Sequence, residues 1–290
     1  MNSLAENQII KFTYGNNIVE RVSLSDSFFM KCEKITLDNN QIFIAKYYQK
    51  KLNINSFNSI LSETNSLIYL LNKFPNLFPS IKYKSKDLLI IDYIESNNIK
   101  NHDYQEKLAI EMLKIHKIKN DKFGFEFDAQ VGGLKQPNNF EENWIDFFIN
   151  YRLNMVFEDI NKKNSMPSSV NRDIQKLMKD LENRLPTKPR PSLLHGDLWE
   201  GNILFLNGDL VGLIDPGIFF GHNEMEIAYL TWFKYVNDTF LNFYSNHTNI
   251  DKNFKDYEPI YQIFFSLLNV RLWDRDFYIK DVQKLLKKVI

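Results

Sequence analysis

The sequence predicts an α+β protein in which strands come first and helices follow. Residues 17–48 have the pattern of strands separated by turns, whereas residues 97–290 have mostly helical patterns. A chain of 290 residues is long enough for about two lobes with sizeable cores. We therefore expect an antiparallel-sheet lobe over residues 1–96 and a larger, mostly helical lobe over residues 97–290.

The first strands form a predicted three-stranded meander over residues 17–48. Turn-forming residues, above all Asp38-Asn39-Asn40, separate its apolar runs. A helix is expected from about Ser56 to Phe74, because apolar residues recur at helical spacing there and Pro75 ends the run. Short strands are expected at residues 81–83 and 87–93. The strand-forming residues of the meander are Ile18, Val22, Phe28, Phe29, Ile35, Ile42 and Ile44.

The polar residues at Glu95–Asn98 are the best candidate for a boundary between the lobes. The pattern beyond them predicts one helix after another. Expected helices cover Tyr104–Lys117, Glu141 to about Asn161, Val170–Leu185, Glu224–Tyr244, Tyr257 to about Trp273 and Val282–Ile290.

Composition narrows the function classes. Lys and Arg number 36 and Asp and Glu number 36, so the net charge is zero and indicates no general affinity for nucleic acid. With 44% hydrophobic residues the chain is not mainly disordered. The single cysteine, Cys32, is expected to be a small strand residue. No signal peptide or membrane span is indicated, so we expect a cytoplasmic protein that does not bind membranes.

The most informative stretch runs from Leu194 to Pro216 and contains a predicted hairpin. Asn207-Gly208 between two apolar runs is a strong hairpin signal, because both central residues of a type I′ turn need positive φ. Pairing outward from the turn brings Asn202 and Asp215 to the same open end. The expected cross-strand pairs are Leu206 with Asp209, Leu204 with Val211 and Asn202 with Leu213.

These residue types suit phosphoryl transfer. An amide oxygen and a carboxylate within about 7 Å can share a hard cation such as Mg²⁺. Asp197 lies five residues before Asn202, and a carboxylate there can accept a proton from an attacking hydroxyl. The spacing of Asp, four residues and Asn matches a kinase catalytic loop. A metal-dependent hydrolase would also use clustered Asp and Asn, so the nucleotide side needs a separate signal.

That signal is Lys46. Alternation in Gln41–Lys46 places this lysine on a strand face with Ile42 and Ile44, and both faces of the strand are apolar. A buried lysine needs an anionic partner, and Glu63 on the following helix is the candidate. The alternative is a lysine that reaches solvent from the end of the strand.

Several separate stretches give the sequence a resemblance to the fructosamine kinase family, the ketoamine-3-kinases within the protein-kinase-like fold. Phe123-Gly124-Phe125 and Trp199, in the stretch from Leu194 to Asn202, are typical of the fructosamine kinase family rather than of the related families of this fold. The stretches are Leu194-His195-Gly196-Asp197-Leu198-Trp199-Glu200-Gly201-Asn202, Asp215-Pro216, Phe220 to Ala228, Phe123-Gly124-Phe125, and Gln136-Pro137-Asn138 followed by Trp144, Phe148, Arg152 and Leu153.

The resemblance implies a role for each matching residue and implies ATP and Mg²⁺ as cofactors. Lys46 and Glu63 would form the ion pair that holds phosphate, and Asp197 would be the catalytic base. Asn202 and Asp215 would hold Mg²⁺. The remaining assignments are adenine binding by a hinge at Ile91, Asp92, Tyr93 and Ile94, phosphate binding at Ser25, Asp26 and Ser27, and substrate contact by Trp199 and Glu224.

Some of the matching residues are expected to be structural. His195 and His116 would brace loops, Phe123, Phe125 and Trp144 would be core residues, and His222, Glu224 and Glu226 would first of all brace the metal loop. The chain departs from the family at Ser23–Phe28, which contains no glycine where a glycine-rich turn covers the phosphates. Ser and Asp can still form a tight turn there.

The implied activity is ATP-dependent phosphorylation of the 3-hydroxyl of ketoamines, a deglycation repair step. Partners would be ketoamine small molecules or glycated proteins, and the protein would be a monomer or weak dimer. One alternative is an aminoglycoside- or choline-type phosphotransferase, although the C-terminal helices mix acidic with basic residues. Another is a catalytically silent nucleotide-binding protein of the same fold, which the complete set of site residues argues against.

Overall fold

The computed structural model describes residues 3–27, 30–50, 52–53, 56–163, 166–273 and 276–290. The chain divides into two compact units. The first unit comprises Met1–Asn101, Ala129–Lys135 and Gly201–Gly217, and the second comprises His102–Asp128, Gln136–Glu200 and Ile218–Ile290. The expected division into a nucleotide-binding lobe at residues 1–96 and a catalytic and substrate-binding lobe at residues 97–290 stays a prediction.

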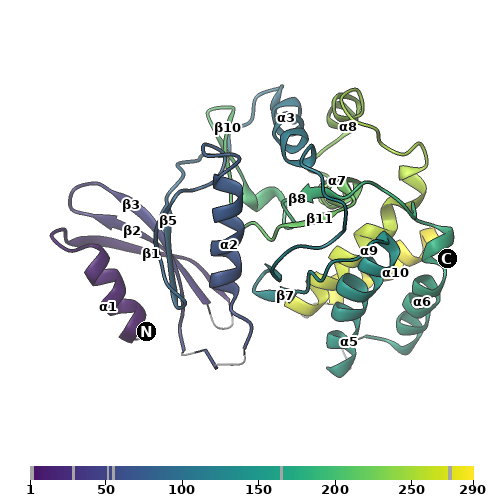
Figure 1. Cartoon of the computed structure of the whole chain (residues 1–290), viewed down its shortest axis with the longest axis horizontal. Coiled ribbons are helices and arrows are strands. Elements are labelled where there is room, and N and C mark those ends of the chain that lie inside the picture. The colour runs from purple at the N-terminus through teal and green to yellow at the C-terminus, as the bar shows by residue number, and fades with distance from the viewer. Residues whose placement is uncertain (1–2, 28–29, 51, 54–55, 164–165, 274–275) are drawn as a thin grey trace. The chain divides into compact units, whose positions relative to one another are not determined.

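A five-stranded antiparallel sheet forms the centre of the first unit (Figure 1). It confirms the predicted meander and the two short strands that follow, although Phe28 and Phe29 lie outside the described residues. In spatial order the strands are β1 (Ile18–Ser27), β2 (Met30–Leu37), β3 (Ile42–Tyr48), β5 (Leu88–Asp92) and β4 (Ile81–Lys84).

Two helices cover opposite faces of this sheet, α1 (Ser3–Phe12) and α2 (Ser59–Leu71) (Figure 1). The predicted burial of both faces of β3 is confirmed, because Phe43 and Ala45 pack in one core with Ile9 of α1. On the other face, the hydroxyl of Tyr48 bonds the side chain of Asn58, the N-cap of α2. Helix α2 was predicted from the sequence and α1 was not, although the second apolar face of β3 needs an element packed against it.

The hairpin of β9 (Ile203–Leu206) and β10 (Asp209–Leu213) has the predicted turn, with φ of 52° at Asn207 and 93° at Gly208. Asp209 pairs with Leu206 as predicted. A bulge between Leu210 and Gly212 then shifts the register by one residue. The predicted pairs Leu204–Val211 and Asn202–Leu213 are therefore wrong, since Leu204 pairs with Gly212 and Ile203 with Leu213.

Backbone and amide hydrogen bonds join this hairpin to the segment that follows β5. The N–H groups of Asn97 and Asn98 both donate to the carbonyl of Phe205, at 3.0 and 2.9 Å. The Asn97 side chain donates to Asn207 Oδ1 at 2.8 Å, and the N–H of Gly208 donates to the carbonyl of Ile99. These bonds explain how residues 201–217 belong to the first unit despite their late place in the chain.

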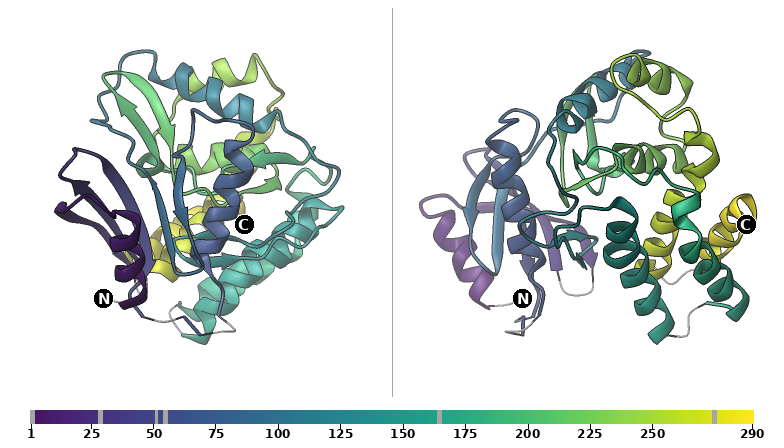
Figure 2. Two further views of the ribbon diagram at one scale, coloured as in Figure 1. Left: turned by 60° about the vertical axis from the view of Figure 1, so that its left-hand side comes forward. Right: turned by 45° about the vertical axis from the view of Figure 1, so that its right-hand side comes forward.

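The second unit is mostly helical (Figures 1 and 2). Its helices are α3 (Tyr104–His116), α4 (Trp144–Phe148), a π-helical turn (Ile149–Leu153), α5 (Asn154–Lys162), α6 (Ser168–Lys179), a 3₁₀ turn (Leu181–Asn183), α7 (Asn223–Trp232), α8 (Asp238–Ser245), α9 (Phe254–Trp273) and α10 (Asp276–Val289). Its strands β8 (Ser192–Leu194) and β11 (Phe219–Gly221) pair with each other. A further pair, β6 (Ala129–Val131) and β7 (Leu134–Gln136), belongs to the first unit except for Gln136.

Three helix predictions need correction. The helix expected at Val170–Leu185 ends at Lys179 as α6, and a separate 3₁₀ turn follows at Leu181–Asn183. The single helix expected at Glu224–Tyr244 is two helices, because Lys234 adopts φ of 56° after α7 and the Asn237 side chain caps α8. The sequence Asn-Asp-Thr at 237–239 carried that signal. Helix α10 begins at Asp276, six residues before the expected start at Val282, because its first turns have few buried apolar residues to mark them.

Aromatic side chains fill the core of the second unit around Trp144, as predicted for this residue and for Phe123 and Phe125. The indole N–H of Trp144 donates to the hydroxyl of Tyr261 at 2.9 Å, and the ring of Phe123 lies 5.1 Å from that of Trp144. Phe125 stacks on Phe220 at 5.5 Å. In the part of the chain that the structure describes, no helix is both long enough and apolar enough to cross a membrane.

The position of α1 predicts that two adjacent isoleucines contribute very differently to the free energy of unfolding. Ile9 is fully buried and Ile10 is 54% exposed. Ile9→Ala should lower the free energy of unfolding by about 2–5 kcal/mol, because it leaves a cavity under the sheet. The control, Ile10→Ala, should change it by less than about 0.5 kcal/mol. Urea unfolding followed by fluorescence measures both, and equal losses would contradict the packing of α1.

Candidate active site

The residues predicted for the site divide between the two units. Lys46, Glu63, Asn202, Asp215 and the hinge at residues 91–94 belong to the first unit. Asp197, Trp199 and Glu224 belong to the second unit.

In the first unit, the ammonium group of Lys46 lies between two carboxylates. Its Nζ is 2.6 Å from Glu63 Oε1 and 2.5 Å from Asp215 Oδ1. Lys46 is only 4% exposed, so it does not reach solvent from the strand end. Burial by itself would lower the pKa of Lys46, but the charges of Asp215 and Glu63 raise it above its ordinary value. Lys46 is therefore protonated and is aimed at an acidic site.

The local structure explains why Lys46 and Glu63 meet. Lys46 is on β3, with β2 on one side and β5 on the other, and faces α2. The Asn58 side chain accepts the N–H of Leu61 at 3.0 Å and so caps α2. Because Asn58 also bonds Tyr48 of the same strand, it anchors the start of α2 to β3, one helical turn before Glu63.

Asp215 and Asn202 both lie at the open end of the β9–β10 hairpin, as predicted, although the register differs. The N–H of Ile214 donates to the backbone carbonyl of Asn202 at 3.1 Å. Asp215 has φ of 57°, a conformation that Asp tolerates better than most residues. Its side chain is 38% exposed, and its Oδ1 forms the ion pair with Lys46.

Among the described residues there is no cluster of three or more His, Cys, Asp or Glu that could hold a metal ion. Asn202 and Asp215 nevertheless provide an amide and a carboxylate, the oxygen donors that suit Mg²⁺. In a nucleotide site, phosphates and water supply the other ligands, so two protein side chains fit such an ion.

In the predicted hinge, the backbone amide of Asp92 is already hydrogen-bonded, whereas Tyr93 and Ile94 follow the end of β5. The N–H of Asp92 donates to the carbonyl of Ser80 at 3.0 Å, and its carboxylate pairs with Lys82 at 2.9 Å. Tyr93 and Ile94 follow Asp92, the last paired residue of β5, and so lie beyond the named strand. Tyr93 and Ile94 can therefore offer backbone groups to a base, whereas the Asp92 amide cannot.

The tight turn expected at Ser23–Phe28 is wrong over its described part. Ser25, Asp26 and Ser27 belong to β1 and pair with β2. Pairing with β2 extends the strand through these residues and outweighs the turn preference of Ser and Asp. Cys32 is in β2 as expected, and burial raises the pKa of its thiol to about 12, so it is not a nucleophile.

In the second unit, Asp197 is 8% exposed and is oriented by two neighbours. The hydroxyl of Tyr229 donates to Asp197 Oδ1 at 3.4 Å. Burial, followed by the charge of Asp197, raises the pKa of Tyr229 well above its ordinary value, so this hydroxyl keeps its proton. The N–H of Asp197 donates to Nδ1 of His195 at 3.3 Å, which confirms a structural role for His195.

Glu226 holds the loop just before Asp197. Its carboxylate accepts the N–H of Gly196 at 2.7 Å and the N–H of His195 at 3.3 Å. His116 Nε2 lies 2.8 Å from the same carboxylate. Burial by itself would raise the pKa of Glu226, but the hydrogen bond from His116 leads the interactions that lower it, so the carboxylate is charged.

Both ring nitrogens of His116 have a hydrogen-bond partner. Its Nε2 lies against the Glu226 carboxylate, and its Nδ1 lies 2.7 Å from the hydroxyl of Tyr244, to which Asn223 donates at 3.0 Å. His116 is thus a bracing residue, as predicted. Glu226 braces the loop of Asp197 rather than the metal loop that we expected.

Glu224 does not have the geometry of a substrate ligand. It is 2% exposed, accepts the N–H of Asp251 at 2.6 Å and accepts the hydroxyl of Tyr257. Both carboxylate oxygens are thus engaged inside the unit, so substrate contact by Glu224 is not supported. His222 beside it bonds the hydroxyl of Tyr261 at 2.7 Å, and burial lowers the pKa of His222 to about 3.

Trp199, in contrast, presents an accessible ring. It is 40% exposed, and its centroid lies 6.1 Å from that of Phe233 at a tilt of 38°. Phe233 supports one part of the indole, while the exposed part remains available to a ligand.

An antiparallel-sheet unit with a buried Lys–Glu pair, together with a helical unit that carries a His-Gly-Asp loop, defines a phosphotransferase of the protein-kinase-like fold. The chain belongs to the fructosamine kinase family, whose model matches residues 5–290. It is accordingly an ATP-dependent phosphotransferase that acts on a hydroxyl group.

Individual relatives agree with the family. The chain is 24% identical over 282 residues to a probable ketoamine kinase of Vibrio cholerae, covering 96% of this chain and 91% of the relative. A crystal structure of a protein assigned as a fructosamine-3-kinase from Thermobifida fusca YX-ER1 matches with a TM-score of 0.84 and 19% identity, over 99% of this chain and 98% of that one. The ADP-bound aminoglycoside phosphotransferase APH(2″)-Ib matches with a TM-score of 0.62 and 18% identity, over 100% and 98%.

Removal of the Lys46 charge should destabilise the protein, because Glu63 becomes a buried carboxylate without its ion-pair partner. Lys46→Met should lower the free energy of unfolding at pH 7 by about 3–5 kcal/mol, because Glu63 then lacks its closest cation. Burial raises the pKa of Glu63, so the variant loses stability as pH rises through that pKa and regains part of it toward about pH 5. Urea unfolding at both pH values measures this. The double variant Lys46→Met/Glu63→Gln should lack the pH-dependent part, and an unchanged pH dependence would contradict the pairing.

The hydrogen bonds that Glu226 accepts predict that Glu226→Gln lowers kcat and leaves the KM for ATP nearly unchanged. Gln offers one acceptor oxygen and one amide donor, so at least one loop N–H loses its acceptor and the loop shifts. We expect kcat to fall about ten- to hundredfold. The KM for ATP should stay nearly constant, because the bonds that Glu226 forms are to His116, His195 and Gly196 and not to the residues proposed to bind the nucleotide. Steady-state kinetics measure both constants, and a rise in KM for ATP with unchanged kcat would contradict the role.

Proposed function

We propose that this enzyme phosphorylates the 3-hydroxyl of ketoamines with ATP and Mg²⁺. The observation that carries the proposal is the buried cluster in which Lys46 joins Glu63 and Asp215, because an ammonium fixed between carboxylates is how kinases prepare a site for nucleotide phosphates. Membership of the fructosamine kinase family supports the choice of acceptor.

On the nucleotide side, Lys46 would bind phosphate oxygens while Glu63 keeps the lysine in place. Asn202 and Asp215 would hold Mg²⁺, which supplies neutralisation of charge on the phosphates when it is bound. The backbone groups of Tyr93 and Ile94 would pair with the adenine. A contact of residues 25–27 with phosphate would be made by strand backbone instead of by a tight turn.

On the acceptor side, Asp197 would accept the proton of the attacking hydroxyl. The hydroxyl oxygen forms a bond to the γ-phosphorus, the bond from that phosphorus to the bridging oxygen breaks, and ADP leaves with the electron pair. The proton passes to Asp197, which Tyr229 and His195 hold in place. Asn202 follows Asp197 by five positions, so chain connectivity limits their Cα separation to about 18 Å.

Trp199 would contact the amine of the acceptor. A ketoamine carries a protonated secondary amine beside the sugar, and an exposed indole face attracts a cation. The phosphorylated adduct is labile, so its formation would begin removal of the sugar and make the reaction a repair step. Both protein-bound and free ketoamines are acceptors of this chemical kind.

A panel of acceptors tests the proposal. ADP release should be fastest with ketoamines and near background with choline and aminoglycosides. Asp197→Asn should lower kcat about 10²–10⁴-fold, because the base is lost. ATP with Mg²⁺ at 100 times its dissociation constant should still stabilise this variant by about 2.7 kcal/mol, as it does the unmodified enzyme. Turnover of choline in place of ketoamines, or full activity of Asp197→Asn, would refute the assignment.

A further inference from the structure

Arg152 is a buried charged residue that the steps above do not use. It lies in the π-helical turn Ile149–Leu153 and is 1% exposed. Its guanidinium donates to the backbone carbonyls of Pro137 and Tyr151, at 2.7 and 2.8 Å, and to Asn138 Oδ1 at 2.7 Å. Burial lowers the pKa of Arg152 to about 9, so the group is charged at pH 7. Because all three acceptors are neutral oxygens, they compensate the burial of this charge less than a carboxylate would.

The contacts of Arg152 lead to three consecutive residues of the same unit, Ile218, Phe219 and Phe220. The guanidinium carbon lies 4.0 Å from the centroid of the Phe219 ring. The amide of Asn138 accepts from Arg152 with its oxygen and donates with its nitrogen to the carbonyl of Ile218 at 3.2 Å. Asn138 is 1% exposed, so this bridge is shielded from water. Arg152 thus holds the chain at Ile218 and Phe219.

Phe220 is held by a separate segment of that unit. The N–H of Gly124 donates to the Phe220 carbonyl, and the N–H of Phe220 donates to the Gly124 carbonyl, both at 2.9 Å. Gly124 has φ of 106°, and a Cβ there would lie 2.5 Å from the carbonyl oxygen of Asn138. Only glycine permits this close approach of the Phe123-Gly124-Phe125 segment to Asn138. Two stretches of the sequence that otherwise have no part in the chemistry therefore meet at residues 218–220.

Residues 218–220 directly follow the segment that carries Asp215. Ile218 comes three positions after Asp215. At the other end of this segment, the N–H of Ile214 donates to the carbonyl of Asn202 at 3.1 Å. Asp215 itself has φ of 57°, a backbone conformation that persists only where the surrounding structure holds it. The bonds at Ile214 and Ile218 therefore restrict the chain on both sides of Asp215.

We infer that Arg152 is a positioning residue for Asp215. Through Asn138 and Phe219 it holds the chain that follows this carboxylate, so that Asp215 keeps the orientation that Mg²⁺ binding requires. The inference rests on the proposed function, in which Asp215 holds Mg²⁺. Groups that orient a metal ligand without touching the metal typically change metal affinity about 10–100-fold when they are altered.

Two variants interrupt this contact in different ways. Arg152→Lys keeps the positive charge, but a single ammonium group cannot bond several oxygens in one plane and stack on a ring at once. Asn138→Ala removes the bond to Ile218 and leaves Arg152 with its bonds to the backbone carbonyls, so it provides the same test if Arg152→Lys does not fold. The double variant combines both changes. Urea unfolding of each protein establishes that it is folded and measures how much stability it has lost.

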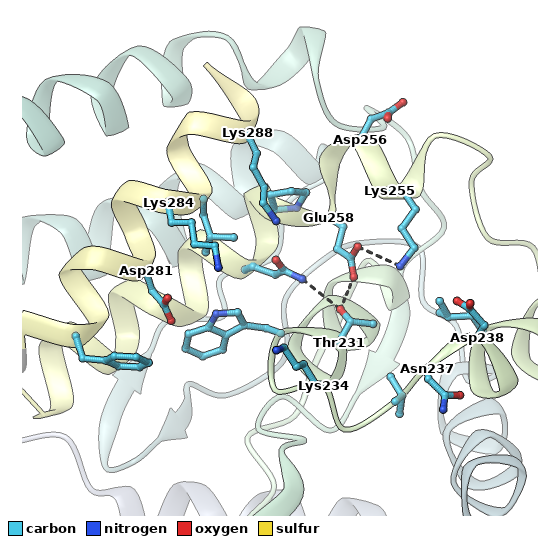
Figure 3. Close-up of a pocket in the computed structure, with 17 residues that line it drawn as sticks. Thr231, Lys234, Asn237, Asp238, Lys255, Asp256, Glu258, Asp281, Lys284 and Lys288 are labelled. Atoms are coloured by element: carbon cyan, nitrogen blue, oxygen red, sulfur yellow. Dashed lines mark hydrogen bonds and ion pairs between the residues drawn. The ribbon is translucent and has the colours of Figure 1, made fainter.

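The control, Glu258→Gln, alters a charged residue elsewhere in the same unit. Glu258 is 8% exposed, pairs with Lys255 at 3.3 Å and accepts the hydroxyl of Thr231 (Figure 3). It lines a cavity between α7, α8, α9 and α10 whose side chains carry charges of both signs. Both partners of Glu258 are on helices α7 and α9, so the control reports the loss of a buried charge without a change at residues 218–220.

Calorimetry measures the dissociation constant of ATP once with Mg²⁺ and once with EDTA, so the readout requires no acceptor and no turnover. In the unmodified enzyme Mg²⁺ should tighten ATP binding. Arg152→Lys and Asn138→Ala should reduce this gain about tenfold and leave binding in EDTA unchanged, because only the metal ligand is displaced. The double variant should lose no more than either single variant, since both changes act through one contact. Glu258→Gln should keep the full gain.

Retention of the full gain in Arg152→Lys and Asn138→Ala would overturn the inference, as would an equal loss in Glu258→Gln or the absence of any gain in the unmodified enzyme. If ketoamines are phosphorylated while both variants keep the gain, the inference fails and the proposed function stands. If both variants lose the gain but no ketoamine leads to ADP release, the proposed acceptor is wrong and the role of Arg152 stands.

Discussion

The first unit depends on the burial of the Lys46 ammonium group between two carboxylates. An isolated buried ammonium costs several kcal/mol, so the fold must bring carboxylates to it. Glu63 comes from the helix that follows the strand, but Asp215 comes from 169 residues further along the chain. The β9–β10 hairpin thereby joins the sheet unit, and the separate bonds from residues 97–99 to that hairpin add to the same attachment.

Glu226 constrains the second unit in the same way that Lys46 constrains the first. It is a buried charge that requires partners, and it finds them in His116 and in the backbone amides of His195 and Gly196. Those amides precede Asp197, so satisfying the carboxylate also shapes the loop that presents the candidate base. In both units a buried ionic group is placed next to the residues proposed for chemistry, and its need for hydrogen bonds makes the local geometry rigid.

Tyr229 of α7 contributes both to the core of the second unit and to the candidate active site. Its side chain is buried, and its hydroxyl donates to Asp197. The same residue therefore stabilises the fold and orients the candidate base.

Local sequence pattern was sufficient to predict the sheet meander, helix α2, the positive-φ turn at Asn207-Gly208 and the pairing of Lys46 with Glu63. These features depend on local periodicity and on residues whose conformation or charge admits few alternatives. The bulge in β10, the helix α1 that covers the sheet, the break before α8 and the strand at Ser25–Ser27 became evident only in the folded structure. Each of these results from packing and pairing with residues distant in the chain, which outweigh local preference and leave little trace in local sequence pattern.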